Sequence, residues 1–380
     1  MNLYWVYHYL DRYIGIPLCL VLSLFTSKRD HSNEYKNILV IKLSMIGDTI
    51  LLVPSVKSLR KHFCKSLITV LCSPLNSDIV KDWNFIDRYI VFDFADCFNR
   101  PWKLIKFIFD LRKNKFDLVI DFETWPRLTP IISLLSGAKE RVGFIVPNQF
   151  RHYLYTKVIP HIKKKHEVES FIDVINYLGV TVEDIQFELK YSKEDEQKID
   201  KLLIDNGIIK NDKFVIIHPG CGIHGYYRQW SEEKYAQICD YIIEKHCLKV
   251  IITGTREDSK IADKIILLTK IKPINFVGKT ELKEFFALVK KSLLVICGNT
   301  GTLHIAAASG IPTIAIHGPT DPEKWGPWGK DHIIIRKNLS CSPCSYLGYE
   351  YGCNKRKCLD LVSVDDVKYA IDKKLGELLN

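Results

Sequence analysis

Short apolar runs alternate with helix-forming segments twice along this 380-residue chain. The runs are apolar at consecutive positions rather than at every second position, which is typical of strands covered by helices on both faces. Such strands form parallel sheets, so the pattern predicts an α/β protein with two Rossmann-like, doubly wound domains. The predicted strands lie at 38–43, 67–72, 88–93, 117–121, 213–218, 248–253, 293–297 and 312–317. The predicted helices lie at 48–62, 101–114, 127–136, 166–178, 231–245, 257–269, 281–290 and 302–309.

The strand pattern also sets the predicted domain bounds. An apolar segment covers 1–33, the first domain covers 34–190, the second covers 191–362, and a helix covers 363–380. Ligands of such sheets bind beyond the carboxyl ends of the strands. We therefore expect a central cleft between the two domains, lined by the loops at 44–48, 220–230, 254–257 and 299–304.

Positive charge is concentrated in one part of the chain. The formal net charge is +10, and the segment from Cys97 to Lys165 holds 14 Lys or Arg residues against 5 Asp or Glu residues. A basic face of this kind suits an anionic partner, although any single lysine in it is more often a solvated surface residue.

The N-terminal segment is apolar from Ile14 to Phe25, which is too short for a transmembrane helix. Asp11 and the absence of a small-residue cleavage site argue against a secretory signal. Two alternatives stay open: an anchor at a membrane surface, or a helix packed on the protein's own core. The residue types typical of a headgroup boundary are Tyr4, Trp5, Tyr7, Tyr9, Tyr13, Lys28 and Arg29.

Eight of the twelve cysteines are scattered through apolar segments, as in a cytosolic protein with reduced, buried thiols. The other four, Cys341, Cys344, Cys353 and Cys358, lie in one loop at 341–358. Three alternatives compete for them: a structural zinc site, which the spacing slightly favours, one or two disulfides, or free thiols.

The stretch FVIIHPGCGIHGYYRQW carries Gly220, Gly222 and Gly225 at the spacing of a dinucleotide fingerprint. Five residues separate Gly225 from the helix that Ser231 is predicted to cap, and no acidic residue ends the next strand. A nicotinamide site is therefore excluded. What remains is a glycine-rich loop followed by Arg228, whose guanidinium suits a phosphate.

A second phosphate-binding candidate follows the strand at 293–297. The turn from Asn299 through Thr300, Gly301 and Thr302 opens an alanine-rich helix, and helix N-termini attract anions. An ordinary helix cap is the alternative. The presence of Arg228 in the same domain favours the anion site.

Three motifs in register resemble those of the bacterial heptosyltransferase family of glycosyltransferases. They are ILVIKLSMIGDTILLVPSVKSLRKHF, HPGCGIHGYYRQWSEEKYAQI and GNTGTLHIAAASGIPTIAIHGPTDPEKWGPWG, and the resemblance runs from about Ile38 to Cys358. It implies a GT-B fold without a catalytic metal. The first domain would bind the acceptor, and the second would bind ADP-heptose.

The resemblance also implies roles for individual residues. Asp48 matches the catalytic base, Arg228 the group that contacts the donor diphosphate, and Glu257 the acid near the nucleoside. An N-cap is the structural alternative for Asp48. The remaining residues expected at the donor are Gly47, Gly220, Gly222, Asn299, Thr300, Gly301, Thr302 and His304.

One position departs from the family pattern. Asn299 stands where the family commonly has an aspartate that contacts sugar hydroxyls, which leaves the sugar open.

The predicted function is inverting, metal-independent transfer of a heptose or related sugar to a lipopolysaccharide core or a similar anionic, lipid-linked glycan. We expect this at the inner face of the cytoplasmic membrane and with no nucleic-acid partner. The alternative is a protein of the same fold that uses another sugar nucleotide or binds one without turnover.

Overall fold

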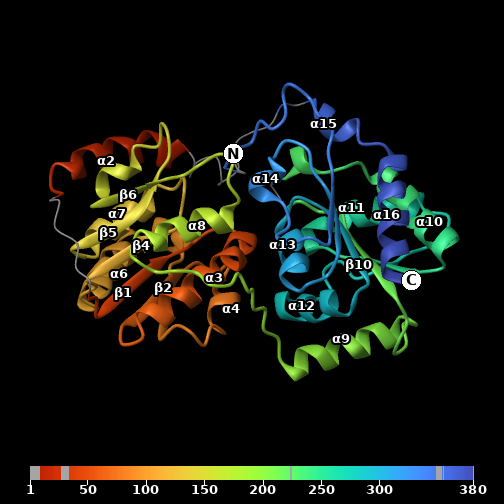
Figure 1. Cartoon of the computed structure of the whole chain (residues 1–380), viewed down its shortest axis with the longest axis horizontal. Coiled ribbons are helices and arrows are strands. Elements are labelled where there is room, and N and C mark those ends of the chain that lie inside the picture. Colours follow the sequence, from red (N-terminus) through yellow and green to blue (C-terminus); the bar gives the residue numbers. More distant parts are fainter. Residues whose placement is uncertain (1–8, 27–33, 223–224, 348–352, 354, 380) are drawn as a thin grey trace. The chain divides into compact units, whose positions relative to one another are not determined.

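The computed structural model describes residues 9–26, 34–222, 225–347, 353 and 355–379. The chain forms two compact units, Met1–Gln186 (unit 1) and Phe187–Asn380 (unit 2), coloured red to yellow-green and green to blue in Figure 1.

Unit 1 is built on a six-stranded parallel sheet in the order β3-β2-β1-β4-β5-β6. This is the strand order of a doubly wound dinucleotide-type fold. Its strands are β1 (Asn37–Ile41), β2 (Leu67–Cys72), β3 (Arg88–Val91), β4 (Leu118–Asp121), β5 (Glu140–Ile145) and β6 (Lys157–Pro160).

Helices cover both faces of this sheet, because right-handed crossovers place the connections from β1 to β3 on one face and those from β3 to β6 on the other. On one face α3 packs against α8, and on the other α7 packs against both α6 and α2. The helices are α2 (Gly15–Ser23), α3 (Ile46–His62), α4 (Ser77–Val80), α5 (Phe94–Asn99), α6 (Pro101–Lys113), α7 (Leu128–Leu135), the 3-10 turn η1 (Arg151–Leu154) and α8 (Glu167–Asn176).

Unit 2 repeats this plan with a second six-stranded parallel sheet, in the order β12-β11-β10-β7-β8-β9. Its strands are β7 (Phe214–His218), β8 (Lys249–Ile252), β9 (Ile274–Asn275), β10 (Leu294–Gly298), β11 (Thr313–Ile316) and β12 (His332–Ile335). Its helices are α9 (Lys193–Asp205), η2 (Tyr226–Arg228), α10 (Glu232–His246), η3 (Arg256–Asp258), α11 (Ser259–Leu268), α12 (Leu282–Lys291), α13 (Gly301–Ala308), α14 (Pro322–Trp325), α15 (Lys357–Asp360) and α16 (Val364–Leu379).

The prediction of two Rossmann-like α/β domains is confirmed, and each of the eight predicted strands is present within a few residues of its expected place. Four strands were not predicted: β5, β6, β9 and β12. β5 begins with Glu140 and Arg141, which are both buried. Their burial is tolerated because Tyr35 Oη donates to Glu140 and because Arg141 donates to main-chain oxygens. The other three are short edge strands, whose exposure weakens the apolar signal.

Helix α2 packs on the protein's own core, which is one of the two alternatives that the sequence left open for the N-terminal segment. Gly15 and Cys19 are buried where α2 packs on η1 and α7, and Asp11 Oδ2 pairs with Arg127 Nη1 at 2.6 Å. Its other side is exposed. Tyr4, Trp5, Tyr7, Lys28 and Arg29 lie outside the described residues. Among the helices that the structure describes, none is both long and apolar enough to cross a membrane.

Candidate active site

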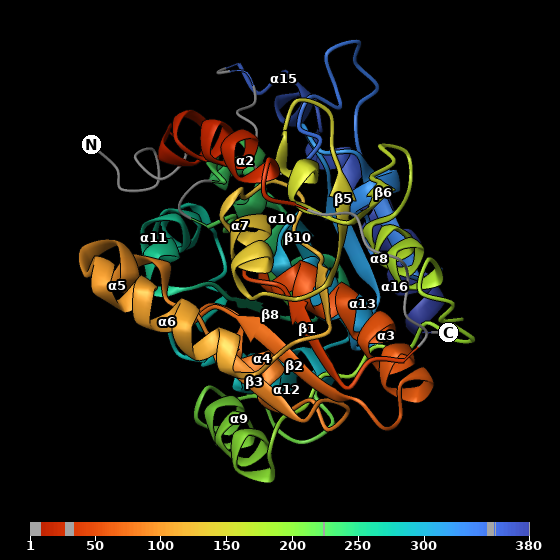
Figure 2. The same ribbon diagram turned by 90° about the vertical axis from the view of Figure 1, so that its left-hand side faces the viewer.

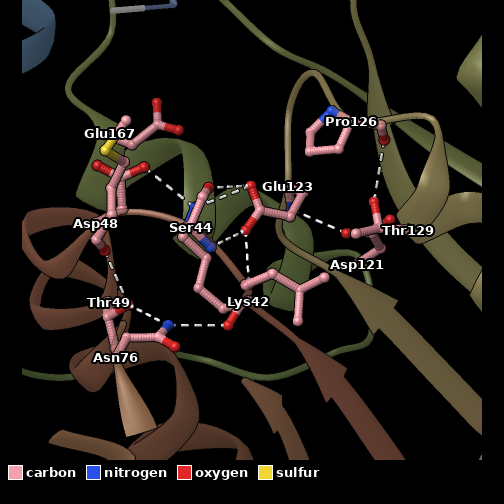
Figure 3. Close-up of polar contacts among 12 residues, drawn as sticks. Lys42, Ser44, Asp48, Thr49, Asn76, Asp121, Glu123, Pro126, Thr129 and Glu167 are labelled. Carbon is pink, nitrogen blue, oxygen red and sulfur yellow. Dashed lines mark hydrogen bonds and ion pairs between the residues drawn. The ribbon is translucent and has the colours of Figure 1, made fainter. Parts of the chain in front are cut away.

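The candidate site in unit 1 lies where the chain direction through the sheet reverses. β1 and β4 are neighbours, but β1 continues towards β2 and β4 continues towards β5. An open α/β sheet leaves a crevice at such a point, beyond the carboxyl ends of the strands. Lys42, Ser44 and Asp48 follow β1, and Glu123 follows β4, so all four lie together at this end of the sheet (Figure 3).

A buried ammonium joins the two loops. Lys42 Nζ lies 3.1 Å from Asp48 Oδ2 and 3.4 Å from Glu123 Oε2. The side chains of Lys42 and Glu123 are almost fully buried, whereas that of Asp48 is 17% exposed. Asp48 is therefore the member of the cluster that solvent or a substrate reaches.

Glu123 fixes the loop that precedes Asp48. Its Oε1 accepts from the main-chain nitrogens of Leu43 and Ser44 at 2.7 and 2.8 Å, and its Oε2 accepts from Ser44 Oγ at 2.7 Å. On the other side of the loop, Asn76 Nδ2 donates to Lys42 O at 3.0 Å and to Thr49 Oγ1 at 2.8 Å. The loop is thus held from β2 and from β4, which keeps the Asp48 carboxylate in one place.

A second buried ion pair holds the main chain at Glu123. Arg151 Nη2 lies 2.9 Å from Asp121 Oδ2, and Tyr155 Oη donates to the same oxygen at 2.5 Å. Arg151 also donates to the main-chain oxygen of Glu123, and Asp121 Oδ1 accepts from Glu123 N at 2.9 Å. This network fixes the turn that ends β4.

The environment of Asp48 suits a proton acceptor. The pKa of Asp48 is raised to about 6. Burial is the largest cause, the ion pair with Lys42 opposes it, and the Glu167 and Glu123 carboxylates add to it. Figure 3 shows Glu167, from the start of α8, beside Asp48. Burial lowers the pKa of Lys42, but Glu123 and Asp48 outweigh it and raise that pKa above its usual value. At neutral pH Asp48 is ionised yet more basic than an exposed carboxylate.

The structural alternative for Asp48, an N-cap, is wrong. Helix α3 begins at Ile46, two residues earlier than predicted, and Met45 occupies the N-cap position without a side-chain hydrogen bond. Asp48 lies in the first turn, and Gly47 beside it is buried. Met45 has a φ of 61°, a left-handed conformation that is costly for a side chain of this kind and is typical of functional loops.

In unit 2 the corresponding reversal lies between β7 and β10. The glycine-rich loop follows β7, but two of its glycines are needed by the protein itself. A Cβ on Gly220 would lie 2.3 Å from Asp258 Oδ1, and a Cβ on Gly225 would lie 1.9 Å from Cys221 O. Gly222 has a φ of 72°, which favours glycine. This loop leads into η2, which ends at Arg228, and Ser231 caps α10 as predicted.

The structure brings Arg228 next to the start of α13. Arg228 Nη1 lies 3.4 Å from Asn299 O, one residue before the Thr300 N-cap. Thr300 makes no side-chain cap bond, so an ordinary cap is not what holds this helix end. Among the described residues, neither the buried Arg228 Nε nor the buried Thr300 Oγ1 has a hydrogen-bond partner. Buried polar atoms are normally paired, so this group is suited to a polar ligand such as an anion.

The other expected donor residues lie around the same sheet end. Thr302 and His304 are buried in α13, and Gly301 is its first residue. The Asn299 side chain is buried, and its Nδ2 donates to Thr320 Oγ1 at 2.7 Å.

Glu257 is exposed in η3, after β8. Hydrogen bonds to a main-chain nitrogen and to Thr255 lower its pKa.

Several site residues were not predicted. Lys42, Glu123 and Glu167 join Asp48 in unit 1, and Asp258 packs against Gly220 in unit 2. The available signal was a charged residue directly after a buried apolar strand, as Lys42 is after β1 and Glu123 is two residues after β4.

The cysteine loop brings thiols close to one another. Burial raises the pKa of Cys344, and the nearby thiols of Cys353 and Cys341 raise it further. Burial likewise raises the pKa of Cys358, with Cys344 and Cys353 nearby. All four are free cysteines, and among the described residues no group of three or more His, Cys, Asp or Glu side chains could hold a metal ion. Residues 348–352 and 354 of this loop lie outside that description.

Comparison with known proteins identifies the family. Residues 104–353 match the family model described as glycosyltransferase family 9 (heptosyltransferase). The chain belongs to this family. It is therefore a glycosyltransferase, and the motifs that resemble heptosyltransferases are correctly interpreted.

Individual relatives agree with this family. Lipopolysaccharide heptosyltransferase 3 of Escherichia coli K12 is 26% identical over 340 residues, which cover 87% of this chain and 96% of the relative. A family 9 glycosyltransferase of Veillonella parvula has a similar structure, with a TM-score of 0.78 at 23% identity, covering 92% of this chain and all of the other. The ADP-heptose LPS heptosyltransferase II of Escherichia coli has a TM-score of 0.70 at 17% identity, covering 90% and 99%. These likenesses confirm the GT-B fold.

Proposed function

We propose that this family 9 glycosyltransferase transfers a heptose or a related sugar, with inversion, from a nucleotide-diphosphate donor, most simply ADP-heptose, to a lipopolysaccharide core or similar lipid-linked glycan. The names of its relatives support the donor and the acceptor class. The observation that carries the proposal is the pairing of Arg228 with the open start of α13 at the strand-order reversal of unit 2.

The donor diphosphate binds in unit 2. Arg228 and the first amides of α13 donate to its oxygens, and Thr300 Oγ1 and Arg228 Nε gain the partners that they otherwise lack among the described residues. As the bond from the anomeric carbon to the diphosphate breaks, the leaving oxygen takes the electron pair. Arg228 and the helix start stabilise that charge, so no divalent cation is required.

The acceptor hydroxyl binds in unit 1, beside Asp48. Its oxygen forms the new bond to the anomeric carbon while its proton passes to the Asp48 carboxylate. Lys42 and Glu123 do not touch the acceptor in this proposal. They are positioning residues: Glu123 fixes the loop that precedes Asp48, and Lys42 lowers the pKa of the carboxylate and so keeps it ionised near neutral pH.

The basic segment of unit 1 supports an anionic acceptor, and with it a place for the reaction. The basic segment 97–165 belongs to unit 1, and a phosphorylated, lipid-linked acceptor would meet it with opposite charge. Such an acceptor is held in a membrane, so the enzyme would act at the inner face of the cytoplasmic membrane.

One observation favours a second candidate function, in which the donor carries another sugar. Asn299 Nδ2 already donates to Thr320 Oγ1, so this side chain presents a neutral amide where the family commonly has a carboxylate. Transfer from another sugar nucleotide, or binding without turnover, is the alternative that this difference supports.

Donor binding is tested by thermal unfolding with ADP in the presence of EDTA. We expect ADP to raise the melting temperature of the wild type, and Arg228→Ala to abolish the shift. The control variant Lys270→Ala removes an exposed lysine of the same unit and should keep the thermal shift. A strict requirement for Mg²⁺ would contradict the metal-free mechanism. Mass spectrometry of the lipid glycan from a deletion strain then identifies the sugar and its acceptor, and an unchanged glycan would favour the binding-only alternative.

A further inference from the structure

Helix α6 carries apolar side chains on two opposite sides. Leu104, Phe107 and Ile108 pack inwards on the core of unit 1. Trp102, Ile105 and Phe109 are spaced as one helical stripe on the other side, and they are 64%, 60% and 65% exposed. The inner side accounts for the folding of the helix, so the outer stripe has no role in the core of unit 1.

Basic side chains surround this outer stripe. Lys106, Arg112 and Lys113 are exposed, and at 100° per residue all three lie within about 70° of its direction. Asp110 is the acidic residue of the helix, and its Oδ1 is paired with Lys113 Nζ at 2.7 Å. An aromatic and aliphatic stripe with a basic border is typical of a helix that lies in the interface of an anionic bilayer.

Residues 14–25, which include α2, carry a second exposed apolar stripe. Ile14, Leu18, Val21 and Phe25 recur at helical spacing and are exposed, while Gly15 and Cys19 face the protein. The two stripes are far apart in the sequence.

The fold places these two stripes on one side of unit 1. Both α2 and α6 pack against α7, which covers the same face of the sheet, and Figure 1 and Figure 2 show α7 between them. Because α2, α7 and α6 form one layer, their outer sides point away from the same face of the sheet.

We propose that the outer faces of α6 and α2 together dock unit 1 on an anionic phospholipid surface. This surface deepens the proposed function, on which it rests for the membrane-held acceptor. A second copy of the chain is a poorer occupant, because a symmetric contact would place the basic border of one α6 against that of the other. Anionic headgroups instead neutralise this border while the apolar side chains enter the acyl boundary.

The test is co-sedimentation of the full chain with phosphatidylcholine vesicles that contain phosphatidylglycerol. One variant combines Trp102→Ala, Ile105→Ala and Phe109→Ala. A second combines Leu18→Ala, Val21→Ala and Phe25→Ala. The matched control removes three exposed apolar side chains of unit 2, by Ile204→Ala, Ile209→Ala and Leu267→Ala.

We expect the wild type to bind these vesicles, and to bind them less at high salt or with phosphatidylcholine alone. Each unit 1 variant should partition about tenfold more weakly or worse, because several buried methylene groups are lost. The control should bind as the wild type does. All variants should keep their circular dichroism spectrum, since the altered side chains are exposed.

Wild-type binding by the α6 variant would overturn the proposal. So would an α6 variant that changes the oligomeric state, by analytical ultracentrifugation, without changing vesicle binding, because the face would then be a protein interface. The thermal shift with ADP separates this proposal from the function. A variant that loses vesicles and keeps the shift supports the surface, whereas a wild type that binds vesicles without any shift contradicts the donor site alone.

Discussion

Replacing Lys42 with methionine removes the cation from the buried cluster at Asp48 and keeps the length of the side chain. Lys42 lowers the pKa of Asp48, whereas burial and the Glu167 and Glu123 carboxylates raise it. In Lys42→Met the pKa of Asp48 should therefore rise above its value of about 6.

The size of this rise follows from the geometry. Two unit charges separated by the 3.1 Å between Lys42 Nζ and Asp48 Oδ2 interact by about 5 kcal/mol at an effective dielectric constant of about 20. This is an upper bound, because Asp48 is 17% exposed and solvent screens the pair. If a third to a half of it is effective, at about 1.4 kcal/mol per unit, the pKa rises by about one to two units.

The assay is the pH dependence of kcat/KM, which reports the ionisation of the free enzyme's base. The acidic limb should move up by about one to two pH units in Lys42→Met and stay in place in Lys61→Met, which removes an exposed lysine of α3. Lys42→Arg keeps the charge and should keep most of the limb's position.

Stability provides an independent measure in the same variant. Without Lys42, the Asp48 and Glu123 carboxylates face each other uncompensated, and breaking a buried pair in this way costs about 3–5 kcal/mol. The Asp48 carboxylate takes up a proton more readily when folded, so the loss should be largest at pH 8 and partly recovered at pH 5. An unshifted acidic limb in folded Lys42→Met, or a stability loss that does not depend on pH, would refute the role of this ion pair.

Other predictions concern Asp48 and the cysteine loop. Asp48→Asn should lower turnover by about 10²–10⁴-fold and leave the ADP thermal shift intact, and turnover within a few-fold of wild type would make Asp48 structural. Because the folded pKa of Asp48, about 6, exceeds its ordinary 3.8, its contribution to stability is present below pH 3.8 and is lost as pH rises through 6. Asp48→Asn should remove that part of the pH dependence in thermal unfolding. Reduced protein should carry close to one zinc per chain if the four thiols of 341–358 form a site, and elemental analysis without metal but with four titratable thiols there would exclude it.

The sequence by itself determined the fold class and the loops that carry the candidate site. Fully buried parallel strands require apolar residues at consecutive positions, and this local requirement is visible in β1, β2, β7 and β10. The loops with Asp48 and Arg228 were predicted for the same reason, since each follows such a strand.

The tertiary structure alone decided which charged residues surround Asp48. Lys42 and Glu123 are 81 positions apart, and they meet because β1 and β4 are neighbours in the sheet, a pairing that no local pattern encodes. β5 escaped prediction because its first residues are charged, and those charges are tolerated in the interior only through partners such as Tyr35, which lies 105 positions from Glu140. Local periodicity therefore predicts which elements form, whereas the burial of a charge depends on partners that only the assembled sheet supplies.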